Sequence, residues 1–221
     1  MISQALAVAK KDILIEYRAK VALNQVIPFA LAVLLLFGFA LDTQAKVLVE
    51  IAPGIFWVVV LFSSLYLISR SMRLERDNGA IDGLALLGID PLAVFLGKLL
   101  ALFLAMSLLE IAVAVGILVL FSANLGSLAL LTVSAVLATL GICSVGLIYG
   151  ALASGERVGE SLLPLLVLPL LAPVLIAATK CWSDASASHG GIYDPWLKLV
   201  VLFSVVFLVV GAVSFGAALE D

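Results

Sequence analysis

The chain has 221 residues, of which 64% are hydrophobic and 12% are charged, with a formal net charge of −3 and a mean hydropathy of +1.28. Soluble domains carry roughly 25% charged residues, so this composition excludes an ordinary soluble protein, which would expose large apolar patches. Because an apolar run of about 20 residues can cross a bilayer, the long apolar runs predict an integral membrane protein.

Residues 1–20 predict an amphipathic helix. Its apolar residues recur at spacings of three and four, at Ile2, Leu6, Ala9, Ile13 and Tyr17. A basic amphipathic helix that precedes a membrane span tends to lie in the plane of the membrane interface. The alternative is a solvated helical leader.

Six apolar runs then predict six transmembrane helices, at about residues 21–41, 51–69, 92–121, 127–153, 162–179 and 196–218. Asp90 followed by Pro91 is a typical start for the third helix, because Asp caps free amide groups and Pro suits the first turn. Cys143 falls inside an apolar run and Cys181 in the polar segment after the fifth run, so we do not expect them to pair. The prediction is an all-α polytopic membrane protein with one transmembrane domain over residues 1–221.

The basic residues predict the orientation of the chain. With the N-terminus in the cytoplasm, nine of the 12 positive residues fall on the cytoplasmic side, namely Lys10, Lys11, Arg18, Lys20, Arg70, Arg73, Arg76, Lys98 and Arg157. Cytoplasmic segments of membrane proteins are enriched in Lys and Arg, and six crossings return the chain to its starting side. Both termini are therefore predicted to be cytoplasmic.

The first cytoplasmic loop, residues 70–91, is the most informative soluble segment. It is charged at its start and then amphipathic, with Ile81, Leu84 and Leu87 three residues apart. A helix this short does not fold alone, so it needs a lipid surface or a partner's groove to pack on. Acidic residues suited to basic groups on such a partner are Glu75, Asp77 and Asp82. The alternative is a solvated connector.

Prolines and glycines mark two of the spans. Pro164, Pro169 and Pro173 predict a bent or broken fifth helix, because an interior proline removes a backbone hydrogen bond. Such a helix could act as a moving gate or be a static kink. In the fourth span, Gly146-x-x-x-Gly150 permits close helix approach and is a weak indication of a dimer face.

Glu110 lies deep in the third span. Ionisable residues inside a membrane are costly, so each is a candidate functional residue and should face the bundle or a water-filled space. Asn24, Gln25 and Ser107 are candidate polar neighbours. The alternative is a structural, hydrogen-bonded residue.

The sequence lacks the motifs of several enzyme classes. Gly97–Lys98 is followed by Leu99 and lacks the upstream glycine of an ATP-binding P-loop. A single histidine, His189, and two separated cysteines do not form a metal site. We therefore predict that the chain is not an enzyme, that it binds no cofactor, and that its energy comes from another subunit or an ion gradient.

Several stretches together resemble one known family. They are Ile51-Ala-Pro-Gly-Ile-Phe-Trp57, Asp77-Asn-Gly-Ala-Ile-Asp-Gly-Leu84, Pro91 with Lys98, and the proline-rich stretch from 162 to 173. In these residues, and in length and span count, the chain resembles the cytochrome c maturation protein B family. These proteins are permease subunits of the bacterial "heme exporter" ABC transporter.

The resemblance implies a type-2 ABC exporter fold with an interfacial N-terminal helix, in the bacterial inner membrane. It implies that the loop around Asp77 is the coupling helix that docks on a cytoplasmic ATPase. The candidate coupling residues are Glu75, Asp77, Gly79, Asp82, Leu84 and Leu87. The implied partners are that ATPase, which would hydrolyse ATP, an inner-membrane heme-handling protein with a small helper, and a periplasmic heme chaperone. The chain would be present as one copy or as a homodimer.

The implied work is ATP-driven release of the heme-loaded chaperone, with heme as a candidate cargo. Two other functions stay open. One is an ion-coupled secondary transporter in which Glu110 relays protons; the other is a non-transporting scaffold for heme-handling proteins.

Overall fold

Helices account for every regular element in the part of the chain that the structure describes. The computed structural model describes residues 1–41, 45–77, 89–123, 126–153, 157–187, 191 and 193–220. In chain order the helices are α1 (Ile2–Ala19), the π-helix η1 (Ala22–Val26), α2 (Ile27–Leu41), α3 (Ala45–Asp77), α5 (Pro91–Phe121), α6 (Leu128–Ala153), α7 (Arg157–Ser186) and α8 (Pro195–Glu220). A helix satisfies its own backbone hydrogen bonds, as a segment in lipid must. The predicted all-α fold is confirmed.

Six helical stretches of the described chain are long and apolar enough to cross a membrane, the number that the sequence predicts. They are Ala22–Leu41, Val47–Leu74, Pro91–Phe121, Leu128–Leu152, Val167–Ser186 and Pro195–Ala217. The third begins as expected, because the Asp90 side chain accepts a hydrogen bond from the Leu92 N–H at 3.0 Å and Pro91 occupies the first turn. The protein is a multi-pass membrane protein.

The fifth spanning helix, α7, extends beyond the end expected from hydropathy. It continues to Ser186, so Cys181 lies in a helix and is buried, and its expected place in a polar loop is wrong. Lys180 made this stretch resemble a loop. In the helix, however, Lys180 is exposed while Cys181, Trp182 and Ala185 are buried. Polar and apolar residues here lie on different faces of one helix, and a hydropathy averaged along the chain does not distinguish these faces.

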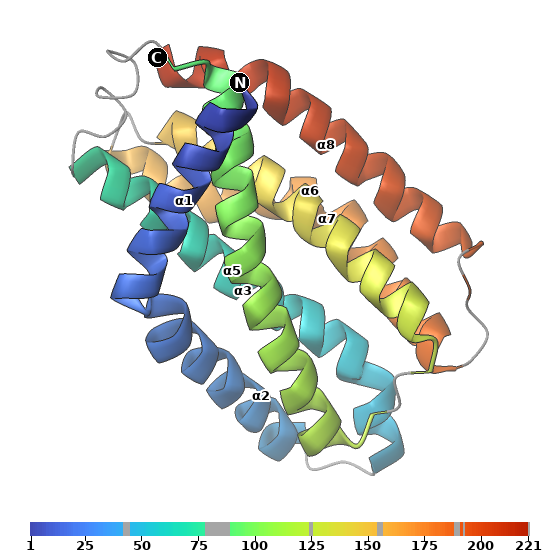
Figure 1. Ribbon diagram of the computed structural model, residues 1–221. Helices are drawn as coiled ribbons and strands as arrows, with labels where there is room; N and C mark the ends of the chain where they lie inside the picture. Colours follow the sequence, from blue (N-terminus) through green and yellow to red (C-terminus); the bar gives the residue numbers. More distant parts are fainter. Residues whose placement is uncertain are drawn as a thin grey trace.

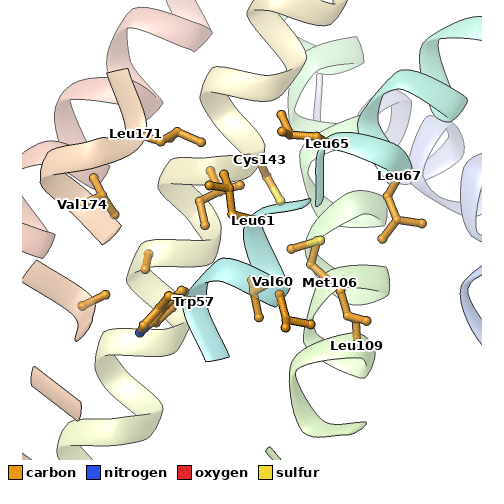
Figure 2. Close-up of a cluster of buried hydrophobic side chains, with 14 of the residues drawn as sticks. Trp57, Val60, Leu61, Leu65, Leu67, Met106, Leu109, Cys143, Leu171 and Val174 are labelled. Carbon is orange, nitrogen blue, oxygen red and sulfur yellow. The ribbon is translucent and has the colours of Figure 1, made fainter. Parts of the chain in front are cut away.

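Helix α3 forms the centre of the bundle. In its most apolar window of 18 residues, 72% of the residues are buried, against 22% in the stretch that contains α2. Figure 2 shows Val60 and Leu61 of α3 between Met106 of α5 on one side and Cys143 of α6 and Leu171 of α7 on the other. Helix α3 is therefore in contact with both halves of the chain.

The other helices form two groups. Helices α6, α7 and α8 contact one another, and α1 and α2 both pack along α5. In Figure 1, α1 and α2 lie on one side of the bundle and α8 on the other. Helix α1 begins and α8 ends at the same end of the bundle, where α3 also ends and α5 begins (Figure 1). We call this end the α1 end.

The small-residue motif of α6 packs inside the chain. A Cβ added at Gly146 would collide with the Ile68 side chain of α3, and one added at Gly150 would lie 2.7 Å from Met72 Cγ. Glycine at both positions lets the side chains of α3 press against the α6 backbone, and alanine would require Ile68 or Met72 to shift. This face of α6 is covered by α3, so the weak indication of a dimer face from the motif was wrong.

Helix α1 is amphipathic, with an unusual orientation of its faces. Ile2, Leu6 and Tyr17 are exposed, whereas Val8 and Ala9 are buried against the bundle. A helix that turns an apolar face outward from the protein suits the boundary between head groups and acyl chains. The inward face of α1, which carries Asp12 and Glu16 beside Val8 and Ala9, meets α3 and α5, as described below.

Candidate functional site

The segment predicted to couple to an ATPase enters and leaves the bundle at the α1 end. Glu75 and Asp77 lie in the last turn of α3. The remaining predicted coupling residues, Gly79, Asp82, Leu84 and Leu87, lie outside the described residues. The flanking helices nevertheless fix where this segment starts and where it stops.

Ion pairs tie α1 to both of these flanking helices. Arg70 Nη1 of α3 lies 2.8 Å from Glu16 Oε2 of α1. Asp12 of α1 reaches Lys98 Nζ of α5 at 3.5 Å through one oxygen and Lys11 Nζ at 3.0 Å through the other. These groups are partly or fully buried, so salt screens them less than it screens pairs on an open surface. Helix α1 therefore braces the end of α3 against the start of α5.

Glu16 has a second role at the break between α1 and the first span. Lys20 ends α1 in the left-handed conformation, with φ of 52°. Beyond it, the Ala22 N–H donates a hydrogen bond of 2.6 Å to Glu16 Oε1. One carboxylate thus holds both the Arg70 guanidinium and a backbone amide at the turn into the membrane.

Close packing accompanies the ion pairs. A Cβ added at Gly97 of α5 would lie 2.6 Å from the Ala5 carbonyl oxygen and 2.7 Å from Val8 Cβ of α1. Only glycine lets the two backbones approach to this distance. The Gly97–Lys98 pair, which fails as an ATP-binding motif, therefore supplies a contact point and an ion-pair partner for α1.

A cavity of about 330 Å³ lies beside the ion pairs, between α1, α3 and α5. Among the described residues, its charged lining residues are Lys11, Asp12, Glu16, Arg70 and Lys98. The rest of its wall is mainly apolar. We refer to this space as the charged cavity.

Sequence reasoning missed this cluster as a site. It used the basic residues only to orient the chain, and Glu16 and Arg70 are 54 positions apart. A signal was available in α1, where Asp12 and Glu16 are four residues apart and so lie on one face. That acidic face in a basic segment indicated contact with positive groups elsewhere.

Glu110 of α5 faces the bundle, as predicted, and is 8% exposed. Its partner is Thr139 of α6, whose hydroxyl donates a hydrogen bond to Glu110 Oε1. Two of the three neighbours expected from sequence are engaged elsewhere: Gln25 Oε1 accepts a hydrogen bond from Tyr66 Oη at 2.9 Å, and Ser107 Oγ donates to the Phe103 carbonyl at 2.8 Å. The third, Asn24, is exposed. The Glu110–Thr139 bond joins two spans inside the bundle, which is typical of polar contacts between transmembrane helices.

The prolines predicted as a gate do not break α7, which is assigned as one helix from Arg157 to Ser186. Pro169 is exposed and Pro173 is half-buried, while the side chain of Pro164 lies outside the described residues. In lipid, a carbonyl freed by proline needs a partner from protein or water. The role of these prolines as a gate stays a prediction.

Two tryptophans, Trp57 of α3 and Trp182 of α7, are buried in the bundle. Trp57 is 2% exposed and Trp182 is 7% exposed. The Phe56 ring stacks on Trp182 with centroids 4.0 Å apart and meets Trp57 edge-on at 5.2 Å. The stacking of Phe56 on Trp182 joins α3 to α7, so both tryptophans contribute to the packing of the bundle. His189 lies outside the described residues.

Known proteins resemble the chain over most of its length. The family model described as "CcmB protein" matches residues 3–221. The proteins named heme exporter protein B of Haemophilus influenzae and of Rhodobacter capsulatus are 31% and 32% identical, covering 84% and 77% of this chain and 85% and 78% of their own lengths. The protein of the same name from Paracoccus denitrificans is 30% identical and covers 94% of each chain.

Proposed function

The chain belongs to the CcmB protein family, and we propose that it is the membrane-spanning permease subunit of an ABC transporter that serves cytochrome c maturation. The observation that carries this proposal is the family match, which covers residues 3–221 and therefore all six candidate spans. The name of the relatives, heme exporter protein B, supports a role in handling heme. Heme is the candidate cargo, and the proposed work is ATP-driven release of a heme-loaded periplasmic chaperone.

The proposed energy source is a separate cytoplasmic ATPase subunit. The sequence lacks a P-loop, and Gly97, the one glycine next to a lysine, fits tightly against α1. This chain would bind no cofactor itself. The further partners in this proposal are an inner-membrane heme-handling protein with its small helper and, where the transporter is dimeric, a second copy of the chain.

We place the ATPase contact in the segment between α3 and α5. Its proposed contact residues are Glu75, Asp77, Gly79, Asp82, Leu84 and Leu87. The ion pairs of α1 support this placement. Because α1 is paired with both α3 and α5, a movement of either helix would also displace α1 and, through it, the other helix. Rigid-body motion of packed helices is a common way for such a movement to cross a membrane protein.

The proposed location is the bacterial inner membrane, with both termini in the cytoplasm. Lys11, Arg70 and Lys98 gather at the α1 end, whereas Lys180 and Lys198 belong to the opposite ends of α7 and α8. Positive residues favour the cytoplasmic side, so this distribution supports a cytoplasmic α1 end.

Charge reversal tests the proposed docking. Asp77→Lys and Asp82→Lys would repel the basic groups of an ATPase, so we expect at least about a fivefold loss of ATPase in pull-downs of the tagged chain, in line with about 1 kcal/mol or more for a charged contact at an interface. Complex ATPase activity should fall as well. Glu50→Lys is the matched control, because Glu50 is exposed near the opposite end of α3.

Equal ATPase recovery and activity for all three variants would contradict docking at this segment. Cytochrome c maturation that survives an inactive ATPase would contradict the transporter function itself and favour the scaffold.

A further inference from the structure

Helix α1 has an outward face that carries three exposed basic residues, Lys10, Arg18 and Lys20. Lys10 and Arg18 are eight residues apart, so two turns of the helix place them on one side. Lys20 ends the helix, two residues before the first candidate span begins at Ala22. We call these three residues the basic flank of α1.

The carboxylates of α1 do not neutralise the basic flank. Residues 1–20 contain two of them, Asp12 and Glu16, and both point toward the bundle, where they pair with Lys98 and Arg70. In the part of the chain that the structure describes, the side chains of the basic flank form no ion pair. The outward face of α1 therefore presents positive groups that are free to meet a negative surface.

An apolar stripe runs beside the basic flank. It consists of Ile2, Leu6, Ile13 and Tyr17, which are 39–75% exposed and recur at intervals of four and seven residues. A helix that carries an apolar stripe next to basic residues lies in the membrane interface, with the stripe inserted and the charges among the head groups. In Figure 1, α1 runs across the direction that α2 follows after the break at Lys20, as expected for a helix that lies along the membrane surface.

We propose that the basic flank of α1 binds the head groups of anionic phospholipids and selects them over zwitterionic ones. The apolar stems of Lys and Arg can lie along the stripe while their charged ends reach the head groups. Each basic residue near an anionic membrane surface favours binding, whereas a zwitterionic head group brings a positive charge of its own. The cytoplasmic leaflet is the anionic one, which agrees with the proposed cytoplasmic α1 end.

Lipid and ion pairs would then hold opposite faces of the same helix. The inner face of α1 pairs with α3 and α5, and the outer face would be fixed by the head groups. The proposal depends on the lipids around α1 and not on the transported cargo or the ATPase. Its test can therefore fail while the proposed function stands.

Short-range quenching of a fluorophore on α1 measures which lipids lie beside this helix. Ala7 is exposed and precedes Lys10 by three residues, so it lies on the side of the basic flank. The native Cys143 and Cys181 are buried, so a bimane label attaches at Ala7→Cys. The full-length protein, purified with its bound subunits, is reconstituted into nanodiscs of equal parts phosphatidylglycerol and phosphatidylcholine. One of the two lipids carries a nitroxide on its acyl chain near the head group.

We expect nitroxide-labelled phosphatidylglycerol to quench the label about fivefold more efficiently than nitroxide-labelled phosphatidylcholine. A factor of this size corresponds to one basic residue near an anionic surface. In the triple variant Lys10→Gln, Arg18→Gln, Lys20→Gln, the two quenching constants should come within about twofold of each other. All three side chains are exposed, so we expect this variant to fold.

Two control variants keep the test specific. The conservative triple variant Lys10→Arg, Arg18→Lys, Lys20→Arg retains the charges and should retain the preference for phosphatidylglycerol. The double variant Lys180→Gln, Lys198→Gln removes two exposed positive charges at the opposite end of the bundle and should retain the preference as well.

Three results would overturn the proposal. Equal quenching by the two lipids with the basic flank intact would show that the apolar stripe alone holds α1 in the membrane. A preference for phosphatidylglycerol that persists in the triple glutamine variant would place the selectivity elsewhere in the chain. Absence of quenching by either lipid would show that a partner protein, and not lipid, covers this face of α1.

Discussion

The two carboxylates of α1 each bind two polar groups of this apolar protein. Glu16 holds Arg70 and the amide of Ala22, and Asp12 joins Lys11 to Lys98. Both carboxylates lie outside the six candidate spans and are partly exposed, so their charge costs less than charge inside a span. Glu110 differs, because it lies inside a span and has a neutral hydroxyl as its partner. The structure therefore offers a structural reason for this residue, in competition with a role in proton relay.

The two roles of Glu110 predict opposite results for one substitution. Glu110→Gln keeps an oxygen that can accept the hydrogen bond from Thr139, so we expect cytochrome c maturation within about twofold of wild type. Thr139→Val removes the donor and should lower the free energy of unfolding by about 0.6–1.7 kcal/mol, the range measured for hydrogen bonds between transmembrane helices. Maturation assays in cells and reversible unfolding in detergent check the two expectations. Loss of maturation in Glu110→Gln, with normal protein levels, would instead favour the ion-coupled transporter.

At the scale of elements, the sequence was informative about helices and uninformative about their partners. Apolar run length predicted six spans, and the Asp90–Pro91 pair marked the start of α5, because both signals are local. The Glu16–Arg70 pair and the Glu110–Thr139 bond join distant parts of the chain, and no periodicity encodes them. The sequence also did not indicate which helices are buried inside the bundle. Lipid is as apolar as a protein interior, so a lipid-facing helix such as α2 and a central helix such as α3 have similar hydropathy.

The packing of α1 against α5 can be tested by a substitution at Gly97. In Gly97→Ala the new methyl group would lie 2.6 Å from a carbonyl oxygen of α1, so one backbone must move. We expect a loss of about 1–3 kcal/mol in the free energy of unfolding, as is usual for overpacking. Gly54→Ala in α3 is the matched control, because nothing lies within 4 Å of the added Cβ. Alanine there should be neutral or stabilise the helix by about 0.5–1 kcal/mol.

Unfolding in detergent, followed by helical circular dichroism, compares the two glycine variants directly. A Gly97→Ala protein as stable as Gly54→Ala would mean that α1 does not pack on α5 in the membrane. The brace between the flanks of the proposed docking segment would then rest on the ion pairs alone.

For the whole molecule, the functional argument depends on which side of the membrane the α1 end faces. Helix α3 ends and α5 begins there, whereas α7 ends and α8 begins at the opposite end (Figure 1). Nothing in the packing of the helices distinguishes the two orientations. The sidedness comes from charge alone, through the gathering of Lys and Arg at the α1 end.

Cysteine labelling in intact cells measures this sidedness. The native Cys143 and Cys181 are both fully buried, so they should give little background with a membrane-impermeant maleimide. Tyr193, which is 91% exposed between α7 and α8, provides the outer site as Tyr193→Cys, and Asp82→Cys provides the inner one. We expect Tyr193→Cys to react in intact cells and Asp82→Cys to react only after the membrane is permeabilised. The reverse pattern would place the proposed docking segment in the periplasm, where no ATP-hydrolysing subunit could reach it.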